Sequence, residues 1–364
     1  MEYYQKIKNL KIKKMRKLAS IQQIKEIKPI EGADRIEKIR INDWWCVSER
    51  GNFNVGDLAV YFEIDALLPS SNPIFSFLAK GNSEKTMAVD GKEYKGYRLK
   101  SIKLRKQLSQ GLALPLFSAL GTTSGNLPIM EGTDVSELLG IVKYEAPISA
   151  QLAGQIKGPF PSFIPKTDEE RVQNLGDLIK EKAGTFMYIT EKLDGSSATY
   201  YKKDGVMCAC SRNLELLDNE GNTIWKLART YTMTENLPNN IAIQGEIVGE
   251  GIQKNPLKLH GQDFYVFNVF DIEKRKFYSL EETENFCKLY GLKMVPILYR
   301  TYVLPGRVDD ILAAAEGNSM ITSSAIREGI VIRPLKEEIV EIDGYPARFS
   351  FKAISNIFLL QEKE

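Results

Sequence analysis

The chain has 364 residues, of which 43% are hydrophobic and 26% charged, a composition typical of globular proteins and a length that favours two or three domains. The formal net charge is only +2, so binding of nucleic acid has to depend on local basic patches rather than on overall charge. A single histidine excludes histidine-rich metal sites, and no apolar run reaches about 18 residues, so we expect no membrane-spanning helix.

The first 140 residues are predicted to form an OB-like β-barrel that binds nucleic acid. Residues 1–17 are basic, which is typical of a solvated tail or of an arm that touches phosphates. Residues 18–118 read as short alternating strands at a spacing of about 10 residues, a pattern that favours a small barrel or sandwich. Trp44 and Trp45 lie in one such strand, where we expect one ring in the core and the other available for base stacking.

Residues 141–166 are rich in proline and glycine and are predicted to be a linker. A second domain is expected at 167–364. Thr167 and Glu170 have the spacing of a capping box, which predicts a helix from Asp168.

The second domain is predicted to be of the α+β class, with antiparallel sheets flanked by helices. The Asp204-Gly205 pair favours a tight hairpin between two alternating segments. Further strands are expected around "IAIQGEIVGEG", "DFYVFNVFDI", "EGIVIRPL" and "PARFSFKAIS", and helices at 281–291, 307–316 and 353–362.

The short motif "EKLDG" at 191–195 raises the question of whether Lys192 is a salt-bridge partner or a nucleophile. A K-x-D-G match alone is weak, because four positions with three fixed recur by chance. Its weight comes from an ordered series of polar residues on later predicted strands. The series comprises Arg212, Asn213, Glu246, Glu328, Arg333 and Lys352, with Phe267 or Phe270 between them.

This order of motifs resembles the covalent nucleotidyltransferase superfamily, which includes DNA ligases, RNA ligases and mRNA capping enzymes. Within it, DNA ligases and capping enzymes carry an OB domain after the last motif, whereas only 12 residues follow Lys352 here. The barrel candidate in front of the motifs is similar to the nick-sealing ATP-dependent RNA ligases with an N-terminal OB module. The resemblance covers nearly the whole chain.

The resemblance implies that Lys192 attacks the α-phosphate of ATP and carries AMP as a phosphoamide. The attacking amine must be neutral, and lysine supplies such an amine when its pKa is lowered. Asp194 would help hold a hydrated Mg²⁺ or Mn²⁺ ion, while Glu191 and Leu193 would face the adenine edge.

Further roles follow from the same resemblance. Glu246 would bind the ribose hydroxyl or the metal shell, and Glu328 would be the main carboxylate on the metal side. Phe267 is preferred over Phe270 for stacking on adenine. Lys352 would contact the α-phosphate and stabilise the charge of the transition state.

Several cations are weaker candidates for contacts with phosphates. Arg171 would reach the phosphates of ATP or the 5′-phosphate of a nick. Arg212 and Arg333 would contact phosphates of the nucleic acid, with Asn213 near the 3′-hydroxyl. For each of these, an ordinary salt bridge is an equal alternative.

Two departures from the family pattern stand out. Ser196 and Ser197 occupy positions near which many relatives have an arginine. The last motif, often K-x-K, is here Ser350-Phe351-Lys352, so one cation of the phosphate clamp is missing or is supplied from elsewhere.

The sequence therefore predicts an ATP-dependent RNA ligase that joins a 3′-hydroxyl to a 5′-phosphate through a lysyl-AMP and an adenylylated 5′ end. The expected partner is RNA or an RNA-containing nicked duplex, and the protein is expected to be a monomer that does not bind membranes. Four cysteines without a CxxC pair favour a reducing, cytoplasmic compartment. The alternatives are a DNA ligase, a capping-type transferase that uses GTP, or a non-catalytic nucleic-acid-binding protein on the same fold.

Overall fold

The computed structural model describes residues 17–89, 91–121, 129–147 and 154–361. The chain divides into two compact units, residues 1–147 and 148–363. The basic segment 1–17 lies outside the described residues except for Lys17. None of the described helices has the length and apolarity needed to cross a membrane.

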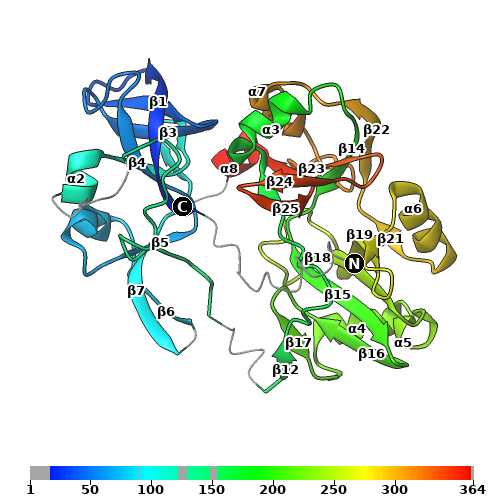
Figure 1. The fold of residues 1–364 in the computed structure, drawn as a ribbon. Coiled ribbons are helices and arrows are strands. Elements are labelled where there is room, and N and C mark those ends of the chain that lie inside the picture. Colours follow the sequence, from blue (N-terminus) through cyan, green and yellow to red (C-terminus); the bar gives the residue numbers. More distant parts are fainter. Residues whose placement is uncertain (1–16, 90, 122–128, 148–153, 362–364) are drawn as a thin grey trace. The chain divides into compact units, whose positions relative to one another are not determined.

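The first unit is built from two main sheets and has the OB fold that the sequence predicts (Figure 1). The five-stranded sheet has the order β10-β4-β1-β2-β3, with strands Leu112–Pro115, Leu58–Phe62, Ala19–Pro29, Ile36–Ile41 and Trp44–Glu49. The four-stranded sheet has the order β11-β5-β7-β6, with strands Val142–Lys143, Ala66–Pro69, Lys92–Arg98 and Lys85–Val89. A small ribbon joins β8 (Ile102–Leu104) to β9 (Gln107–Ser109), and the helices are η1 (Pro73–Lys80) and α2 (Leu116–Leu120).

Strand β1 bends and pairs with two different strands along its length. Its first half pairs with β4 from Ala19 to Gln23, and its second half pairs with β2 from Ile24 onward. The register shifts between Ile24 and Glu26, and such a bulge increases strand twist and curls a sheet towards a barrel. The alternating pattern of β3 buries Trp44 and leaves Trp45 half-buried.

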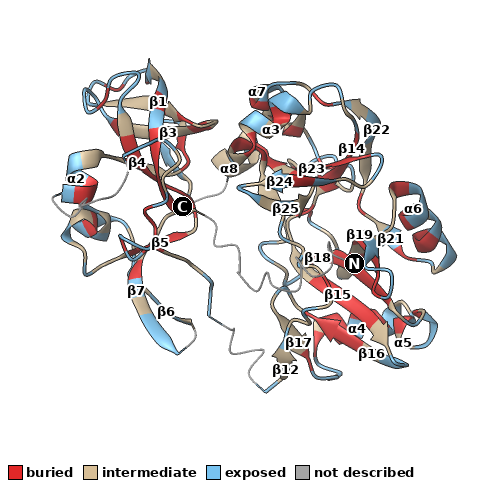
Figure 2. Ribbon diagram, viewed as in Figure 1, coloured by how far each residue is buried: buried red, intermediate tan, exposed pale blue. Residues whose placement is uncertain are grey.

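The second unit contains an eight-stranded sheet in which the middle strands are largely buried (Figure 2). Its order is β12-β17-β16-β15-β18-β19-β20 with β21 also on β19, and the strands are Ile156–Pro159, Leu214–Leu216, Val206–Cys210, Ser196–Lys203, Ile241–Gly249, Gln262–Asp271, Lys276–Phe277 and Lys293–Met294. Asp204 and Gly205 both have positive φ in the β15–β16 turn, and the ladder from Thr199 to Lys203 confirms the predicted hairpin.

Apolar side chains pack one face of this sheet against α4 (Thr223–Thr230), α5 (Met233–Asn236) and α6 (Leu280–Leu289). Helix α6 begins with a capping box in which Ser279 and Glu282 exchange hydrogen bonds. It corresponds to the helix expected at 281–291.

A five-stranded sheet completes the second unit. Its order is β13-β26-β23-β14-β22, with strands Glu170–Arg171, Phe351–Ile354, Gly329–Pro334, Phe186–Lys192 and Ile297–Val303. Its apolar core includes residues of η4 (Val172–Asn174), α3 (Gly176–Glu181) and α7 (Val308–Ala315). Strands β24 (Ile339–Ile342) and β25 (Tyr345–Arg348) form a separate hairpin, and α8 spans Asn356–Gln361.

The prediction of a helix from Asp168 is wrong. Glu170 and Arg171 form the short strand β13, and the first α-helix of this region begins at Gly176. The Thr167 hydroxyl lies 3.1 Å from the Ser197 hydroxyl, and Glu170 accepts a hydrogen bond from the Asn174 amide at 2.8 Å. Both side chains therefore have partners other than the backbone N–H groups that a capping box would use.

Two other boundaries differ from expectation. The predicted linker 141–166 contributes β11 to a sheet of the first unit and β12 to a sheet of the second, and the division between units falls after Pro147. The helix expected at 353–362 is shorter, because residues up to Ile354 belong to β26.

Candidate active site

Lys192 lies at the end of β14 with its amine held by a carboxylate from the next strand. Its register partner in β23 is Gly329, so the preceding residue, Glu328, faces it. Both Glu328 oxygens accept hydrogen bonds from Lys192 Nζ, at 2.6 and 2.7 Å. Both side chains are largely covered, at 26% and 15% exposure, so this is not a fully exposed surface pair.

Gly195 brings the end of the K-x-D-G segment close to β18. A Cβ atom at this position would lie 2.2 Å from the Ile247 carbonyl oxygen and 2.9 Å from Cγ of Glu246. Such contacts cannot be accommodated without movement, so glycine is required for this close approach. The approach brings Asp194 and Glu246 into the same electrostatic environment as Lys192.

The pKa values of this cluster reflect burial and mutual charge. Burial lowers the pKa of Lys192, but Glu328, Glu246 and Asp194 together outweigh it, so its pKa is raised. Burial raises the pKa of Glu246 to about 7, and Lys192 partly offsets this effect. Without a bound ligand, Lys192 is therefore protonated at neutral pH, and Glu246 is about half protonated near pH 7.

Lys352 is a second, half-buried lysine near Lys192. It lies on β26, where its register partners are Arg171 of β13 and Val331 of β23. Burial, followed by the charges of Lys192 and Arg171, lowers the pKa of Lys352 to about 8. Three cations thus lie close together, an arrangement that suits a ligand with several negative charges.

Glu191 points in the opposite direction from Lys192 and is 2% exposed. Its Oε2 accepts a hydrogen bond from the Met320 backbone N–H at 2.8 Å, while Oε1 is buried and has no hydrogen-bond partner among the described residues. Burial raises the pKa of this carboxyl group. An unsatisfied buried acceptor is costly unless a ligand supplies a donor.

An apolar group lies beside this acceptor position. Leu193 and Val248 belong to a small buried cluster against which the half-buried Phe267 packs. Phe270 is instead 3% exposed and packs edge-on against Phe277 in a different cluster. The structure therefore separates the two phenylalanines and leaves Phe267 beside the K-x-D-G segment.

Arg212 and Asn213 follow β16. Their contacts and charges connect them to the charge cluster around Lys192. Arg212 Nη2 pairs with Asp168 Oδ1 at 2.5 Å, and its charge lowers the pKa of Glu246. Asn213 Oδ1 accepts a hydrogen bond from Lys166 Nζ at 2.8 Å. Ser197, one of the two serines after the motif, is the register partner of Glu246.

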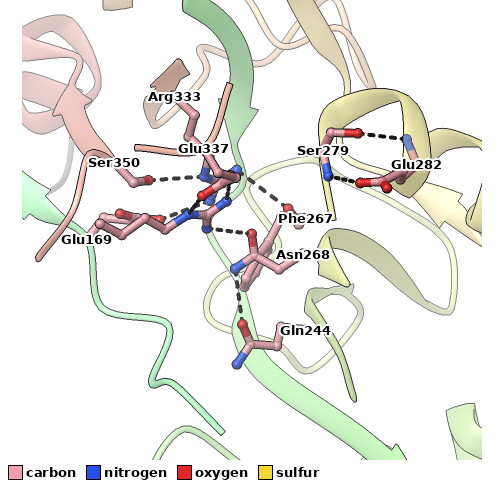
Figure 3. A network of polar contacts seen from close by, with 10 residues as sticks. Glu169, Gln244, Phe267, Asn268, Ser279, Glu282, Arg333, Glu337 and Ser350 are labelled. Atoms are coloured by element: carbon pink, nitrogen blue, oxygen red, sulfur yellow. Dashed lines mark hydrogen bonds and ion pairs between the residues drawn. The ribbon is translucent and has the colours of Figure 1, made fainter. Parts of the chain in front are cut away.

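Arg333 differs from expectation, because its side chain is 2% exposed. Its guanidinium donates to Glu169 Oε1 at 2.9 Å, to Ser350 Oγ at 3.0 Å and to the Phe267 carbonyl at 3.5 Å (Figure 3). A buried guanidinium with these partners does not present itself to a nucleic acid. We therefore withdraw Arg333 as a candidate for a contact with nucleic-acid phosphates.

Sequence reasoning missed Glu169, the partner of Arg333, and it also missed Asn268 and Gln244, which belong to a neighbouring polar network. Asn268 connects Arg348 to Gln244, with distances of 3.0 Å on each side. The only signal in the sequence was a pair of polar residues within the apolar strands "IAIQGEIVG" and "DFYVFNVFD". Polar residues inside apolar strands require buried partners.

The carboxylates present fit a divalent cation of the Mg²⁺ type. Asp194, Glu246 and Glu328 carry oxygen atoms that suit such an ion, and burial raises the pKa of Glu246 to about 7 although Lys192 partly offsets it. Among the described residues, no three acidic, histidine or cysteine side chains converge to hold an ion by themselves. Mg²⁺ commonly uses one or two protein carboxylates, keeps several waters and binds substrate phosphates.

Comparisons with known proteins agree with this geometry. A family model described as RNA ligase matches residues 185–354, and one described as an OB-fold domain matches residues 18–116. No curated protein matches the chain.

Among solved structures, an RNA ligase from Naegleria gruberi with pyrophosphate is 42% identical, with a TM-score of 0.79 over 95% of this chain and 99% of that chain. A lysine-to-alanine variant of that ligase with ATP and Mn is 42% identical, with a TM-score of 0.79 over 94% and 98% of the two chains. A lysine-to-methionine variant with AMP and Mn is 43% identical, with the same TM-score and coverage.

Proposed function

The chain belongs to the RNA ligase family and is an ATP-dependent RNA ligase, and we propose that Lys192 is the residue that carries AMP. The observation that carries this assignment is the buried Lys192 amine, held by both oxygens of Glu328 within a cluster of carboxylates and a second lysine. A structural salt bridge needs neither the second lysine nor the additional carboxylates.

In the first step, the Lys192 ammonium loses a proton to solvent, and the freed Nζ lone pair then forms a bond to the α-phosphorus of ATP. The bond between the α-phosphorus and the bridging oxygen breaks, pyrophosphate leaves with the electron pair, and Nζ releases a second proton to solvent. Lys352 and Arg171 would stabilise the negative charge that develops on the phosphates. AMP then passes to the 5′-phosphate of RNA, and a 3′-hydroxyl displaces it to form the phosphodiester.

The raised pKa of Lys192 means that its amine is protonated in the ligand-free pocket. Asp194, Glu246 and Glu328 would hold Mg²⁺ or Mn²⁺, directly or through waters. A bound divalent cation would neutralise these carboxylates and so remove their preference for a protonated lysine. The amine can then lose its proton when the cation binds, which explains why the nucleophile lies next to three acids.

Glu191 and Phe267 are proposed to select adenine. The unsatisfied Oε1 of Glu191 would accept a hydrogen bond from the exocyclic amine of adenine, and Phe267 would stack on the ring. Guanine carries an oxygen at the corresponding position, which would leave the buried carboxylate without a donor. Leu193 would pack beside the base from the same segment.

We propose that Arg212 supplies the cation that relatives place after the K-x-D-G motif. Ser197 is the register partner of Glu246, and Arg212 is near enough to lower the Glu246 pKa. The Arg212 side chain is 57% exposed, so it can reach a ribose or a phosphate at the pocket mouth. Asn213, its neighbour, would then lie near the 3′-hydroxyl.

The first unit is proposed to be a nucleic-acid-binding module that extends over residues 1–140. Lys38, Lys28 and Arg40 lie 4.8, 5.3 and 5.6 Å from the centre of the half-buried Trp45 ring. An aromatic ring among cations on an OB sheet suits a nucleic-acid strand. We propose an RNA-containing nicked duplex as the substrate.

We further propose a monomer, because every pocket residue described above comes from one unit of one chain. All four cysteine thiols are buried and unpaired, which supports a reducing compartment such as the cytoplasm.

A sealing assay with matched nicks tests the substrate. Purified full-length protein should join a duplex nick with an RNA 3′-hydroxyl strand when ATP and Mg²⁺ are present, and it should seal the all-DNA nick more slowly. Equal or faster sealing of the all-DNA nick would favour the DNA ligase alternative.

A further inference from the structure

Arg333 is one of the largest fully buried side chains of the protein, although its sequence position suggested a surface contact. It lies near the end of β23, and its three nitrogens bond to three different segments, through Glu169, Ser350 and the Phe267 carbonyl (Figure 3). Replacing such a group by an apolar side chain is often neutral for stability, so stability alone is a weak explanation for it.

Two of these contacts lie next to proposed phosphate ligands. Glu169 is two residues before Arg171, and Ser350 is two residues before Lys352. Arg171 and Lys352 are themselves register partners in the parallel pair β13–β26. Arg333 therefore connects the segments that lead into the two strands carrying these cations.

Strand β13 has only two residues, so its own ladder gives it little support. The segment before it contains no helix, and its position depends on side chains. Glu169 anchors it from one side through Arg333. Gln244 anchors its beginning, since its Nε2 donates to the Pro165 carbonyl at 2.7 Å.

A second arginine, Arg348, also acts on Glu169. Burial raises the pKa of Glu169, but the charges of Arg333 and Arg348 outweigh this effect and keep it ionised. Arg348 is itself held by Glu337 at 2.8 Å and by Asn268, and its guanidinium lies 3.9 Å from the centre of the Phe277 ring. Glu169 thus accepts a hydrogen bond from Arg333 and is kept ionised by the charges of two arginines.

We propose that Arg333 is a positioning residue that, through Glu169 and Ser350, holds β13 in register with β26 and so sets the spacing of Arg171 and Lys352 on the phosphates of ATP. The inference rests on the proposed function, because that function gives Arg171 and Lys352 their substrate. Misplacement of charged groups by about 1 Å can cost about 100-fold in rate, so the effect on catalysis should be large.

The test is a double-mutant cycle on the rate of AMP transfer to the full-length protein. One change combines Arg333→Met with Glu169→Gln, which removes both charges and leaves no buried ion unpaired. The maximal rate of AMP transfer should fall about 10- to 100-fold, with little change in the ATP concentration that gives half the maximal rate. Arg300→Met, which removes an arginine from an exposed pair with Glu284, is the matched control and should label as the wild type does.

The same double change is then made in an Arg171→Ala background. If Arg333 acts through Arg171, the additional loss there should be no more than about twofold. An equal fold loss in both backgrounds would overturn the inference, because the network would then act independently of Arg171. If the double variant does not fold, Ser350→Ala, which removes one contact of Arg333, is put through the same cycle and is judged by the same criterion.

The two claims fail separately. If the wild type never acquires AMP, the proposed function is wrong. If the wild type is labelled and the Arg333→Met, Glu169→Gln variant is labelled at the same rate, the inference about Arg333 is wrong and the function stands.

Discussion

At the scale of single residues, the pocket combines charges that would be unfavourable without a ligand. Three carboxylates surround Lys192, and two further cations lie near it. Glu246 shows the consequence most clearly, since burial raises its pKa to about 7. A nucleotide with a divalent cation would satisfy both sets of charges at once.

This imbalance predicts a pH-dependent effect of Glu246→Gln on stability. A carboxyl group whose pKa is raised from 4.5 to about 7 on folding contributes stability below pH 4.5 and loses it as the pH rises through 7. The ligand-free wild type should therefore lose about 2 to 4 kcal/mol more unfolding free energy between pH 5 and pH 8 than the glutamine variant. Urea unfolding of both proteins at the two pH values measures this difference. The prediction would be contradicted if the wild type and the variant differed in unfolding free energy by the same amount at both pH values.

Gly195 offers a second prediction at this scale. In Gly195→Ala, the new Cβ would meet the Ile247 carbonyl oxygen, so the chain has to shift near Asp194. We expect a loss of about 1 to 3 kcal/mol in unfolding free energy and at least about a tenfold fall in the rate of AMP transfer. Gly158→Ala is the control, because its Cβ would have nothing within 4 Å and its φ is not positive. Wild-type rates in Gly195→Ala would show that the close approach is not needed.

At the scale of elements, the outer face of β1, β2 and β3 is arranged around Trp45. Lys28 and Lys38 are register partners on neighbouring strands, although like charges directly opposite one another are destabilising. Glu26 pairs with Lys28 and Asp43 pairs with Arg40, whereas Lys38 makes no ion pair with any described residue. A phosphate would relieve the repulsion between the lysines.

This arrangement predicts that Trp45→Ala weakens RNA binding without affecting AMP transfer. Loss of one stacking platform should cost about 1 to 3 kcal/mol of binding free energy. Lys38→Met should lower the dependence of binding on salt, since one phosphate contact is lost. Fluorescence titration with a nicked duplex at two salt concentrations measures both effects.

The control is Lys95→Met, which removes an exposed lysine from β7 in another sheet. RNA binding by Trp45→Ala that equals the wild type would exclude this face as the binding site.

The elements that were predicted correctly depend on neighbours in sequence. The hairpin at Asp204-Gly205 follows from turn chemistry, and α6, expected from its apolar pattern, begins at a capping box that the structure shows between the sequence neighbours Ser279 and Glu282. In place of the helix expected from Asp168, the Thr167 hydroxyl lies against Ser197, which is 30 residues away in the chain. Sequence patterns cannot reveal such competition.

The site residues likewise divide into those that the motifs predict and those whose partners are distant in the chain. The order of the motifs predicted which residues act together, and the structure brings Lys192, Glu246 and Glu328 into one charge cluster. Arg333 could not be assigned from sequence, because its burial depends on Glu169, which is 164 residues away. Long-range polar partners are specified by the fold and not by local spacing.

At the scale of the whole molecule, the proposed functions fall in two separate units. The residues proposed to bind the nucleotide all belong to the unit at 148–363. The OB unit carries the Trp45 face. This division predicts that changes in the OB unit alter RNA binding, whereas changes in the pocket abolish AMP transfer.

The most direct test of the account is covalent labelling of the purified full-length protein with α-labelled ATP and Mg²⁺, followed by mass spectrometry of its peptides. We predict one AMP bound through a phosphoamide at Lys192, no label in Lys192→Ala, and little or no label when GTP replaces ATP. AMP on another residue, undiminished labelling of Lys192→Ala, or labelling by GTP alone would contradict the central assignment.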